Sequence, residues 1–438
     1  MDGYLFSMVM IGALLTLVLL GVHIVTALGI VSLGGIAMLM GGVEPALRLL
    51  SNTVYEAIRD YVFAVVPLFV LMGELVARSG AATDLYKVVN RALGRLPGRL
   101  AIATVGGNAV FGAVTGVSIA SAATFSRIAY PEMVAHRYHR STALASIAGS
   151  SALGMLIPPS VLMIVWGILT EQSIGRLFIA GIVPGILLAV MFAVFLFGYA
   201  LARPDLFGGT ADKDEAPPPI TRSDLLGVAG IVTLIFLVLG GIWFGLFTPT
   251  EAAGIGALLA LVLALLKGQK PRDIAEAVWQ TGRTSAPILF LLIMAQLYSR
   301  LLAFGGIIDS IQGTLLGLGL TVFAVVAVMI LLWFILGMFV DSVSIILLTV
   351  PIFHPIAVTL GLDPIAFAIV GILAIEAGLV TPPFGISVFT VKSTINDPSI
   401  TLGALFKSVT PYWIMMIILA FAVLTMPWMA NGLYEILS

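Results

Sequence analysis

The chain has 438 residues, of which 60% are hydrophobic and only 10% are charged, and its mean hydropathy is +1.14. These values exceed those of soluble globular proteins and predict an all-α polytopic membrane protein embedded in a lipid bilayer. The net charge of −1 provides no basic surface for nucleic acid, and the absence of cysteine excludes disulfides, thiolate metal sites and cysteine nucleophiles.

The first quarter of the chain contains three apolar runs, at about residues 4–22, 24–41 and 60–77. Each is long enough, or nearly so, to cross about 30 Å of hydrocarbon. No basic region precedes the first run, so we expect a spanning helix there rather than a removed signal peptide. The next segment, 78–99, places five Lys and Arg side chains among apolar residues at helical spacing, which predicts an amphipathic basic helix along the cytoplasmic surface.

The following run, 100–125, is apolar but rich in Gly, Ser and Thr, and basic residues lie on both of its flanks. A spanning helix here would place one basic flank outside, against the positive-inside bias. We therefore expect a re-entrant hairpin that enters from the cytoplasm and turns near 115–121. In the next run, 141–170, two adjacent prolines remove backbone donors and predict a broken helix, after which 177–202 returns to the cytoplasm.

The second half of the chain repeats the first at an offset of 224 residues. This offset aligns Gly154 with Gly378 and Ser118 with Ser342, and it brings the two Pro-Pro pairs into register. Paired interruptions at corresponding places in two halves are typical of a transporter binding site near the bilayer midplane.

A polar, proline-rich segment at 203–223 is predicted to be a cytoplasmic linker between a first repeat, 1–202, and a second repeat, 224–438. In the first repeat we expect scaffold helices over 1–77, an amphipathic arm over 78–99, and a hairpin and broken helix over 100–202. In the second repeat we expect scaffold spans at about 224–247, 251–267 and 284–303, a hairpin run at 319–353, a broken helix at 364–391 and a last span at 405–432.

The distribution of basic residues supports this topology. The predicted cytoplasmic segments hold 17 of the 21 Lys and Arg residues, and the outer segments hold four: Arg48, Arg59, Arg176 and Arg300. The flanks of the second hairpin, 304–318 and 354–363, contain no Lys or Arg, so this hairpin is predicted to enter from outside. An odd number of crossings then separates the halves, which makes them an inverted repeat.

A hairpin tip that meets a broken helix at mid-membrane offers unpaired carbonyls, hydroxyls and half-helix N-termini. Carbonyls and hydroxyls suit a monovalent cation such as Na⁺, and the N-termini suit a carboxylate. The candidate cation ligands are Ser118, Gly154, Pro158, Asp341, Ser342, Gly378, Thr381 and Pro382, and the candidate substrate-binding residues are Ser118, Ser121, Ser342 and Ser344.

Simpler roles remain open for some of these residues. Ser and Gly in membrane helices often serve close packing alone, which applies first to Ser121 and Ser344. Asp341 lies deep in an apolar run, where a carboxylate is costly, so a functional role is expected over a structural hydrogen bond. Glu376 lies in the second broken helix and either faces the site or partners a neighbour.

The sequence offers no catalytic motif that would favour an enzyme over a transporter. The sequence contains no zincin motif, no Gly-x-Ser-x-Gly and no phosphate-binding loop. The chain is therefore not expected to be an enzyme or to use ATP directly, and ion-coupled transport remains.

The chain resembles the large membrane subunit of tripartite ATP-independent periplasmic (TRAP) transporters, the DctM-like family. Four motifs carry this resemblance: 381–385 (TPPFG), 158–160 (PPS), 247–254 (FTPTEAAG) and 337–341 (GMFVD). The resemblance covers essentially the whole chain. It implies an elevator-type Na⁺ symporter of the bacterial inner membrane. Its expected partners are a separate small four-helix membrane subunit and a periplasmic binding protein that delivers an organic acid.

The same resemblance implies about two sodium sites. One lies between the tip around Ser118 and the break at Pro158, another lies between 341–342 and 381–382, and the substrate sits between the tips. The first break reads Ile157-Pro-Pro, without the Thr of the second, so the hydroxyl ligand of the first site stays open. The alternative function is a stand-alone sodium/dicarboxylate symporter that needs no binding protein.

Overall fold

A computed structural model describes residues 3–209, 219–317 and 319–437. Within these ranges the regular structure is helical, and an isolated bridge joins Tyr138 to Phe207. Eight helical segments of this described part are long and apolar enough to cross a membrane. The all-α polytopic fold is therefore confirmed.

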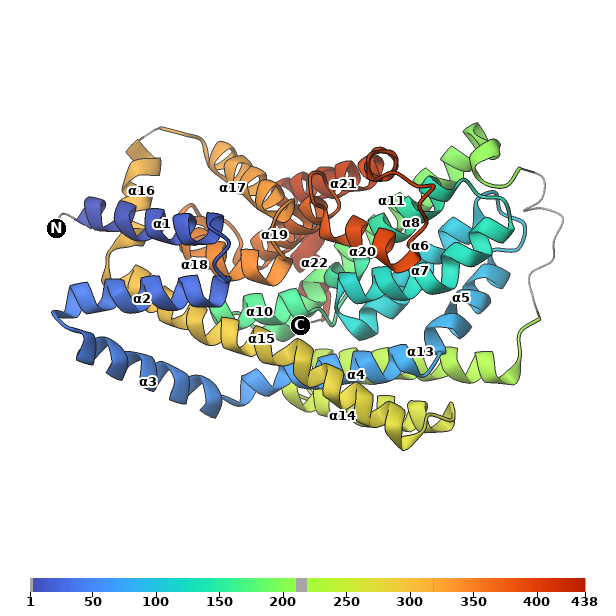
Figure 1. Ribbon diagram of the computed structural model, residues 1–438, viewed down its shortest axis with the longest axis horizontal. Coiled ribbons are helices and arrows are strands. Elements are labelled where there is room, and N and C mark those ends of the chain that lie inside the picture. The colour runs from blue at the N-terminus through green and yellow to red at the C-terminus, as the bar shows by residue number, and fades with distance from the viewer. Residues whose placement is uncertain (1–2, 210–218, 318, 438) are drawn as a thin grey trace.

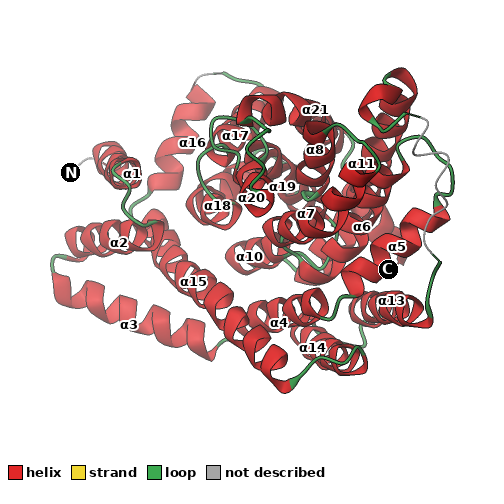
Figure 2. Ribbon diagram, turned by 45° about the vertical axis from the view of Figure 1, so that its right-hand side comes forward, coloured by secondary structure: helices red, strands yellow, loops and turns green. Residues whose placement is uncertain are grey.

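The helices form two layers, seen in both Figure 1 and Figure 2. The lower layer holds most of the scaffold: α2 (Ile24–Met40), α3 (Val43–Arg59), η1 (Tyr61–Ala64), α4 (Val65–Arg78), α13 (Arg222–Trp243), α14 (Pro249–Leu266) and α15 (Pro271–Phe304). Helix α1 (Gly3–Leu19), which also belongs to the scaffold, lies above α2 and packs against both α2 and α16. Helix α4 packs against both α14 and α15, and α15 packs against α2, so helices from the two halves hold the scaffold together.

The upper layer contains the hairpins and broken helices. Its first-half members are α6 (Arg99–Thr115), α7 (Ser118–Ala135), α8 (Arg140–Ser150), α9 (Leu153–Leu156), α10 (Val161–Thr170), α11 (Ile174–Ala202) and η2 (Pro204–Leu206). Its second-half members are α16 (Ile307–Gly317), α17 (Val322–Gly337), α18 (Ser342–Thr359), α19 (Pro364–Leu379), α20 (Ile386–Ile395), α21 (Leu402–Thr425) and α22 (Trp428–Leu437).

Both predicted hairpins exist as pairs of helices joined by short turns. Helices α6 and α7 turn at 116–117, and α17 and α18 turn at 338–341. The open end of the first hairpin is closed by a contact between Arg99 Nη2 and His136 Nε2 at 3.5 Å, which shows that its two arms double back. That the hairpins are re-entrant, and that they enter from opposite membrane faces, stay predictions.

The two repeats interlock in the upper layer. Helix α10 of the first broken helix packs against α18 of the second hairpin, and α20 of the second broken helix packs against α7 of the first hairpin. Trp166 on α10 and Trp333 on α17 lie 5.9 Å apart between ring centroids. Because each half supplies a partner for the other half's hairpin, the four elements pack as one body.

Several element boundaries differ from the sequence prediction. The segment between the predicted spans 251–267 and 284–303 is mostly the first part of α15, whose 34 residues extend about 50 Å at 1.5 Å per residue. Pro271 at the first helical turn and Asp273 bonded to the Lys270 backbone start this helix well before its apolar part. The last span also ends early, because Pro427 separates α21 from α22.

Two further helices were missed, and one was predicted too long. Helix α3 lies in a stretch assigned to an outer connection, and α16 lies in the flank of the second hairpin. The amphipathic helix predicted over 78–99 is confined to α5 (Ala81–Ala92), because glycines in left-handed conformations at 80 and 94 end it on both sides. Part of the predicted linker, 210–218, lies outside the described residues.

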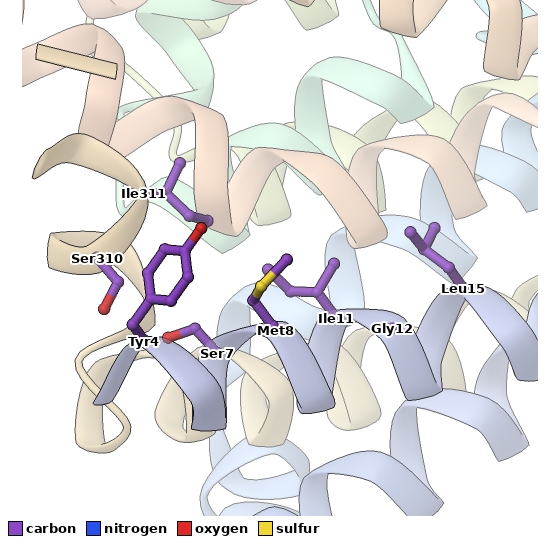
Figure 3. Close-up of a pocket in the computed structure, with 8 residues that line it drawn as sticks. All are labelled: Tyr4, Ser7, Met8, Ile11, Gly12, Leu15, Ser310 and Ile311. Carbon is purple, nitrogen blue, oxygen red and sulfur yellow. The ribbon is translucent and has the colours of Figure 1, made fainter. Parts of the chain in front are cut away.

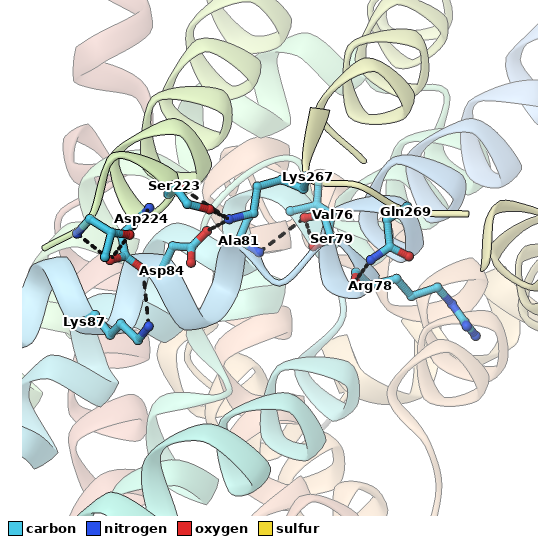
Figure 4. Close-up of polar contacts among 11 residues, drawn as sticks. Val76, Arg78, Ser79, Ala81, Asp84, Lys87, Ser223, Asp224, Lys267 and Gln269 are labelled. Carbon is cyan, nitrogen blue, oxygen red and sulfur yellow. Dashed lines mark hydrogen bonds and ion pairs between the residues drawn. The ribbon is translucent and has the colours of Figure 1, made fainter. Parts of the chain in front are cut away.

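Polar contacts attach α5 to the scaffold of the second half (Figure 4). The Lys267 ammonium donates to Asp84 Oδ2 at 2.6 Å, and Lys87 pairs with Asp224 at 3.3 Å. Burial raises the pKa of the Asp84 carboxyl, and the Lys267 charge acts in the opposite direction. The opposite side of α5 packs on α6, so this helix connects the scaffold to the first hairpin.

The topology gives a direct labelling prediction, which uses the absence of native cysteine. Single cysteines at the exposed positions Arg95 and Arg137 flank α6 and α7. We expect both to be shielded from an impermeant thiol reagent added outside intact cells, because a hairpin returns to the side it entered. An Arg48→Cys control, on the predicted outer side, should be labelled. Labelling at only one of the two flanking positions would mean that α6 and α7 do not form a re-entrant pair.

Candidate functional site

In the first half, the hairpin tip rests directly on the broken helix. The backbone N–H of Val161, the first residue of α10, donates to the carbonyl of Gly116 at 3.2 Å. A Cβ at Gly112 would lie 2.5 Å from the Cα of Gly154, so the two backbones approach as only glycine permits. The predicted partnership between the first tip and the Pro158 break is therefore present in the structure.

The hydroxyls of this first half-site are buried. Ser118 is 0% exposed, and its Oγ is buried without a hydrogen-bond partner. Ser121 is also fully buried, and its Oγ lies 3.5 Å from Thr115 Oγ1. Ser160 donates to the Met155 carbonyl at 2.5 Å and receives the N–H of Met163 at 3.5 Å, so it closes the break and caps α10.

Thr115 is a polar residue that the sequence analysis did not single out. It places a hydroxyl at the tip beside Ser121, while its own Oγ1 donates to the Phe111 carbonyl at 3.2 Å. The sequence could have identified Thr115 as a tip residue, because it directly precedes the glycine of the hairpin turn and a hydroxyl at that position must lie at the tip.

The second half-site has the same construction. The N–H of Gly385, directly before α20, donates to the Met338 carbonyl at 3.4 Å. A Cβ at Gly378 would lie 2.4 Å from the Phe334 carbonyl oxygen, so the second tip is also pressed onto its break. Thr381 donates its hydroxyl hydrogen to the Ala377 carbonyl at 2.7 Å, which leaves the oxygen lone pairs available to accept.

Asp341 has a defined structural role at the second tip. Its Oδ1 accepts the backbone N–H of Ser344 at 3.0 Å, so the carboxylate is the N-cap of α18. Ser342 and Ser344 are both buried beside it. The predicted residues of this half are thus brought together, and Asp341 orders the tip in addition to any ligand role.

The two half-sites differ in exposure. Pro158 and Pro159 at the first break are buried, whereas Pro382 at the second break is exposed. Phe339 and Phe384, which flank the second tip and break, are 53% and 55% exposed, with ring centroids 5.8 Å apart. The rim of the second break is therefore exposed, although Ser342, Ser344 and Thr381 of the second half-site are buried, as are the hydroxyls of the first.

The donor set fits a monovalent cation better than a divalent metal. No group of three or more His, Asp or Glu suited to a metal ion occurs in the described ranges. Each half-site instead supplies carbonyl and hydroxyl oxygens and few carboxylates. These oxygens suit a hard cation, but the site carries too little negative charge to balance a divalent ion.

Other features of the molecule lie away from this chemistry. A pocket of about 390 Å³ between α1 and α16 is lined mainly by apolar side chains, as Figure 3 shows. At the end of the upper layer, Asp397 receives bonds from Tyr130 and Arg140 at 3.0 and 2.5 Å. Hydrogen bonds from Ser399 lower the pKa of Asp397 to about 2, so this carboxylate stays charged and holds α7 and α8 to the loop before α21.

A helical membrane protein in which two hairpin tips meet two broken helices has the architecture of a secondary transporter. Residues 11–429 match the family model described as the tripartite ATP-independent periplasmic transporter, DctM component. The chain belongs to this family, whose members are transporter components, and it is a multi-pass protein of the inner membrane.

Individual relatives agree with this membership. The chain is 32% identical to the C4-dicarboxylate TRAP transporter large permease protein DctM of Pseudomonas aeruginosa over 87% of both chains. It is 32% identical to the ectoine TRAP transporter large permease protein TeaC of Halomonas elongata over 95% of this chain and 96% of the relative. The crystal structure of the Alcanivorax borkumensis YdaH transporter has a similar fold, with a TM-score of 0.63, 16% identity, and coverage of 89% of this chain and 90% of that one.

The second tip gives a mutational prediction. Asp341→Asn keeps the N-cap, because Asn caps as well as Asp, but it removes the charge. We expect substrate uptake to fall about tenfold or more, equivalent to about 1.4 kcal/mol, with thermal unfolding close to wild type. Asp341→Ala should also impair uptake and cost about 1 kcal/mol of capping, and Ser342→Ala should impair uptake.

The matched control is Asp363→Asn. Asp363 caps α19 through a bond from Ala366 N at 2.7 Å, away from both tips, so uptake should be unchanged. Initial uptake rates in proteoliposomes and melting temperatures in detergent provide the measurements. Normal sodium-dependent uptake in both Asp341→Ala and Ser342→Ala would contradict the assignment of this tip.

Proposed function

We propose that this protein is the large permease subunit of a sodium-coupled TRAP transporter that imports an organic acid. The observation that carries the proposal is the pair of half-sites, in each of which a hairpin tip is hydrogen-bonded to a helix break. Such junctions offer carbonyl and hydroxyl oxygens to Na⁺ and helix N-termini to a carboxylate. A second candidate, the stand-alone symporter, has no separate observation in its favour.

The substrate class follows from the relatives and from the site together. Relatives are named for C4-dicarboxylates, ectoine and, at 26% identity, sialic acid. Each of these compounds carries a carboxylate. The starts of α7 and α18 lie at the two tips, where their positive ends favour such a group. We assign substrate contacts to Ser118, Ser121, Ser342 and Ser344, and we leave the particular acid to measurement.

The family description implies two partners. A tripartite periplasmic system combines the large permease with a small four-helix membrane subunit and a soluble periplasmic protein that delivers the substrate. We propose that both partners are separate chains that act with this one.

Reconstitution provides the test of this function. Proteoliposomes containing the permease and its small subunit should take up a labelled organic acid when Na⁺ is present outside and the loaded binding protein is added. Omission of the binding protein should abolish uptake, since it delivers the substrate. Replacement of Na⁺ by choline should do the same. Uptake that needs no binding protein would favour the stand-alone symporter, and uptake that ignores Na⁺ would refute sodium coupling.

The mechanism we propose is an elevator, in which the interlocked upper layer slides against the scaffold. Apolar and close backbone contacts between the layers support this. Phe69 on α4 faces Phe178 on α11 with centroids 5.9 Å apart, and a Cβ at Gly73 would lie 2.9 Å from the Cα of Thr115 at the first tip. Such surfaces permit sliding at lower cost than a network of ion pairs.

Crosslinking across this interface gives the corresponding prediction. A Phe69→Cys, Phe178→Cys double variant, joined by a bifunctional reagent that reductant cleaves, should lose uptake and regain it on reduction. Each single variant treated in the same way should retain uptake, which controls for modification alone. Intact sodium-driven uptake after efficient crosslinking of this and other pairs across the interface would refute the elevator and favour gating around a fixed site.

A further inference from the structure

Glu376 is a buried carboxyl of the second repeat that faces the site of the first. It lies in the last two turns of α19, five residues before Thr381, and is 2% exposed. The hydroxyl of Ser118, at the tip of the first hairpin, lies near enough to this carboxyl to interact with it electrostatically. The two groups nevertheless do not reach hydrogen-bonding geometry, because Glu376 Oε1 and Ser118 Oγ are both buried without a partner.

Two unpartnered buried oxygens that face one another are costly. A polar group removed from water without a hydrogen bond loses free energy, and an unpaired carboxylate loses far more. No Lys or Arg forms an ion pair with Glu376 in the described part of the chain. Carboxyls at such depth in a membrane protein are functional by default. The arrangement therefore points to a positive ligand that the two oxygens share.

The comparison of the repeats explains why the first half needs an acid from elsewhere. Asp341 caps α18 in the second half, and the residue at the same place in the first half is Val117, which offers α7 no side-chain cap. The position in the first repeat that corresponds to Glu376 is Ala152. Each half-site thus receives one carboxyl, but the second obtains it from its own tip and the first obtains it from the opposite repeat.

The interlocked packing makes this exchange possible. Helix α19 contacts α9 and α10 of the first broken helix. On its other side, Gly378 presses against Gly337 of the second hairpin. Helix α19 therefore stands between the two half-sites, and Glu376 points from it toward the first.

We propose that Glu376 supplies the charged ligand of the first cation site, opposite Ser118 and beside the backbone of the Gly154 to Pro158 break. This inference rests on the sodium coupling proposed above and identifies the acidic ligand of one site. One carboxylate balances one monovalent cation, whereas a divalent ion would leave an uncompensated buried charge. Since Glu376 lies on the helix that leads directly into the break at Thr381 of the second site, occupancy of one site should affect the other.

The decisive variant is Glu376→Gln, which keeps the shape and the hydrogen-bonding capacity of the side chain and removes only its charge. Initial uptake rates are measured against external Na⁺, with choline as replacement and with saturating loaded binding protein. We expect the half-saturating Na⁺ concentration to rise about tenfold, and the Hill coefficient to fall toward one, as the loss of one coupled site requires. A purely structural Glu376 would change expression or stability but not this sodium dependence.

A second readout does not depend on transport. In detergent, added Na⁺ should raise the melting temperature of the wild type, because a ligand that binds only the folded state stabilises it. The rise should be smaller in Glu376→Gln and in Ser118→Ala. The matched control is Glu74→Gln, which removes a carboxyl in α4 that pairs with Arg78 at 3.6 Å and should leave both readouts unchanged.

The outcomes separate the inference from the function on which it rests. If wild-type uptake ignores Na⁺, sodium coupling fails and the cation site fails with it. If the wild type responds to Na⁺ and Glu376→Gln matches it in half-saturation, Hill coefficient and thermal shift, sodium coupling stands and the role of Glu376 is refuted. If Glu376→Gln does not fold, Glu376→Asp, which keeps the charge but withdraws the carboxylate from Ser118, decides through the same two sodium readouts: a weaker response to Na⁺ supports the role of Glu376, and a wild-type response refutes it.

Discussion

The structure depends on one constraint: a helix that breaks inside a membrane must have its freed backbone groups satisfied by protein or by a bound ligand. In each half the Pro-Pro pair breaks the helix, and a carbonyl of the hairpin tip accepts the backbone N–H of the residue at which the helix resumes. Small residues at the contact are required because the backbones nearly touch, as at Gly112 and Gly154. The hairpins are therefore the structural complement of the breaks, and the oxygens that remain between them form the site.

The two halves meet this constraint with different chemistry. The second tip carries its own carboxylate as a helix cap and is partly exposed at Phe339, while the first tip is mostly buried and has a helix start without a side-chain cap. An internal repeat gives two sites with one architecture, but it does not require the same ligands in both. Because the repeats pack crosswise, a residue of one half can complete the site of the other. The sequences of the two halves can then diverge without either site losing a needed ligand.

The fold was largely predictable because its strongest signals are local. Apolar length predicted the spans, and the Pro-Pro pairs predicted the breaks. A glycine-rich run between basic flanks predicted the first hairpin, and its alignment with the second half of the chain predicted the second. Helix α3 was missed because its sequence is amphipathic rather than apolar, although it is as long as α1 and α2, and α16 was missed because it is short. Helix α15 was underestimated because the polar sequence at its start is typical of a loop. The placement of Glu376 against Ser118 could not be predicted, because it joins different repeats and no spacing rule relates the two positions.

Two polar clusters show how the molecule is held as separate layers. Lys267 and Asp84 join the arm α5 to the scaffold, while Asp397 joins α7 and α8 to the loop before α21 within the upper layer. Between the layers, by contrast, the contacts of Phe69 and Gly73 involve rings and backbone rather than ion pairs. Ion pairs and hydrogen bonds within a layer resist its deformation. Apolar packing between the layers is non-directional, so it does not hold the two layers in one relative position. A relative displacement of the layers would then leave each half-site intact, since both tips and both breaks belong to the same layer.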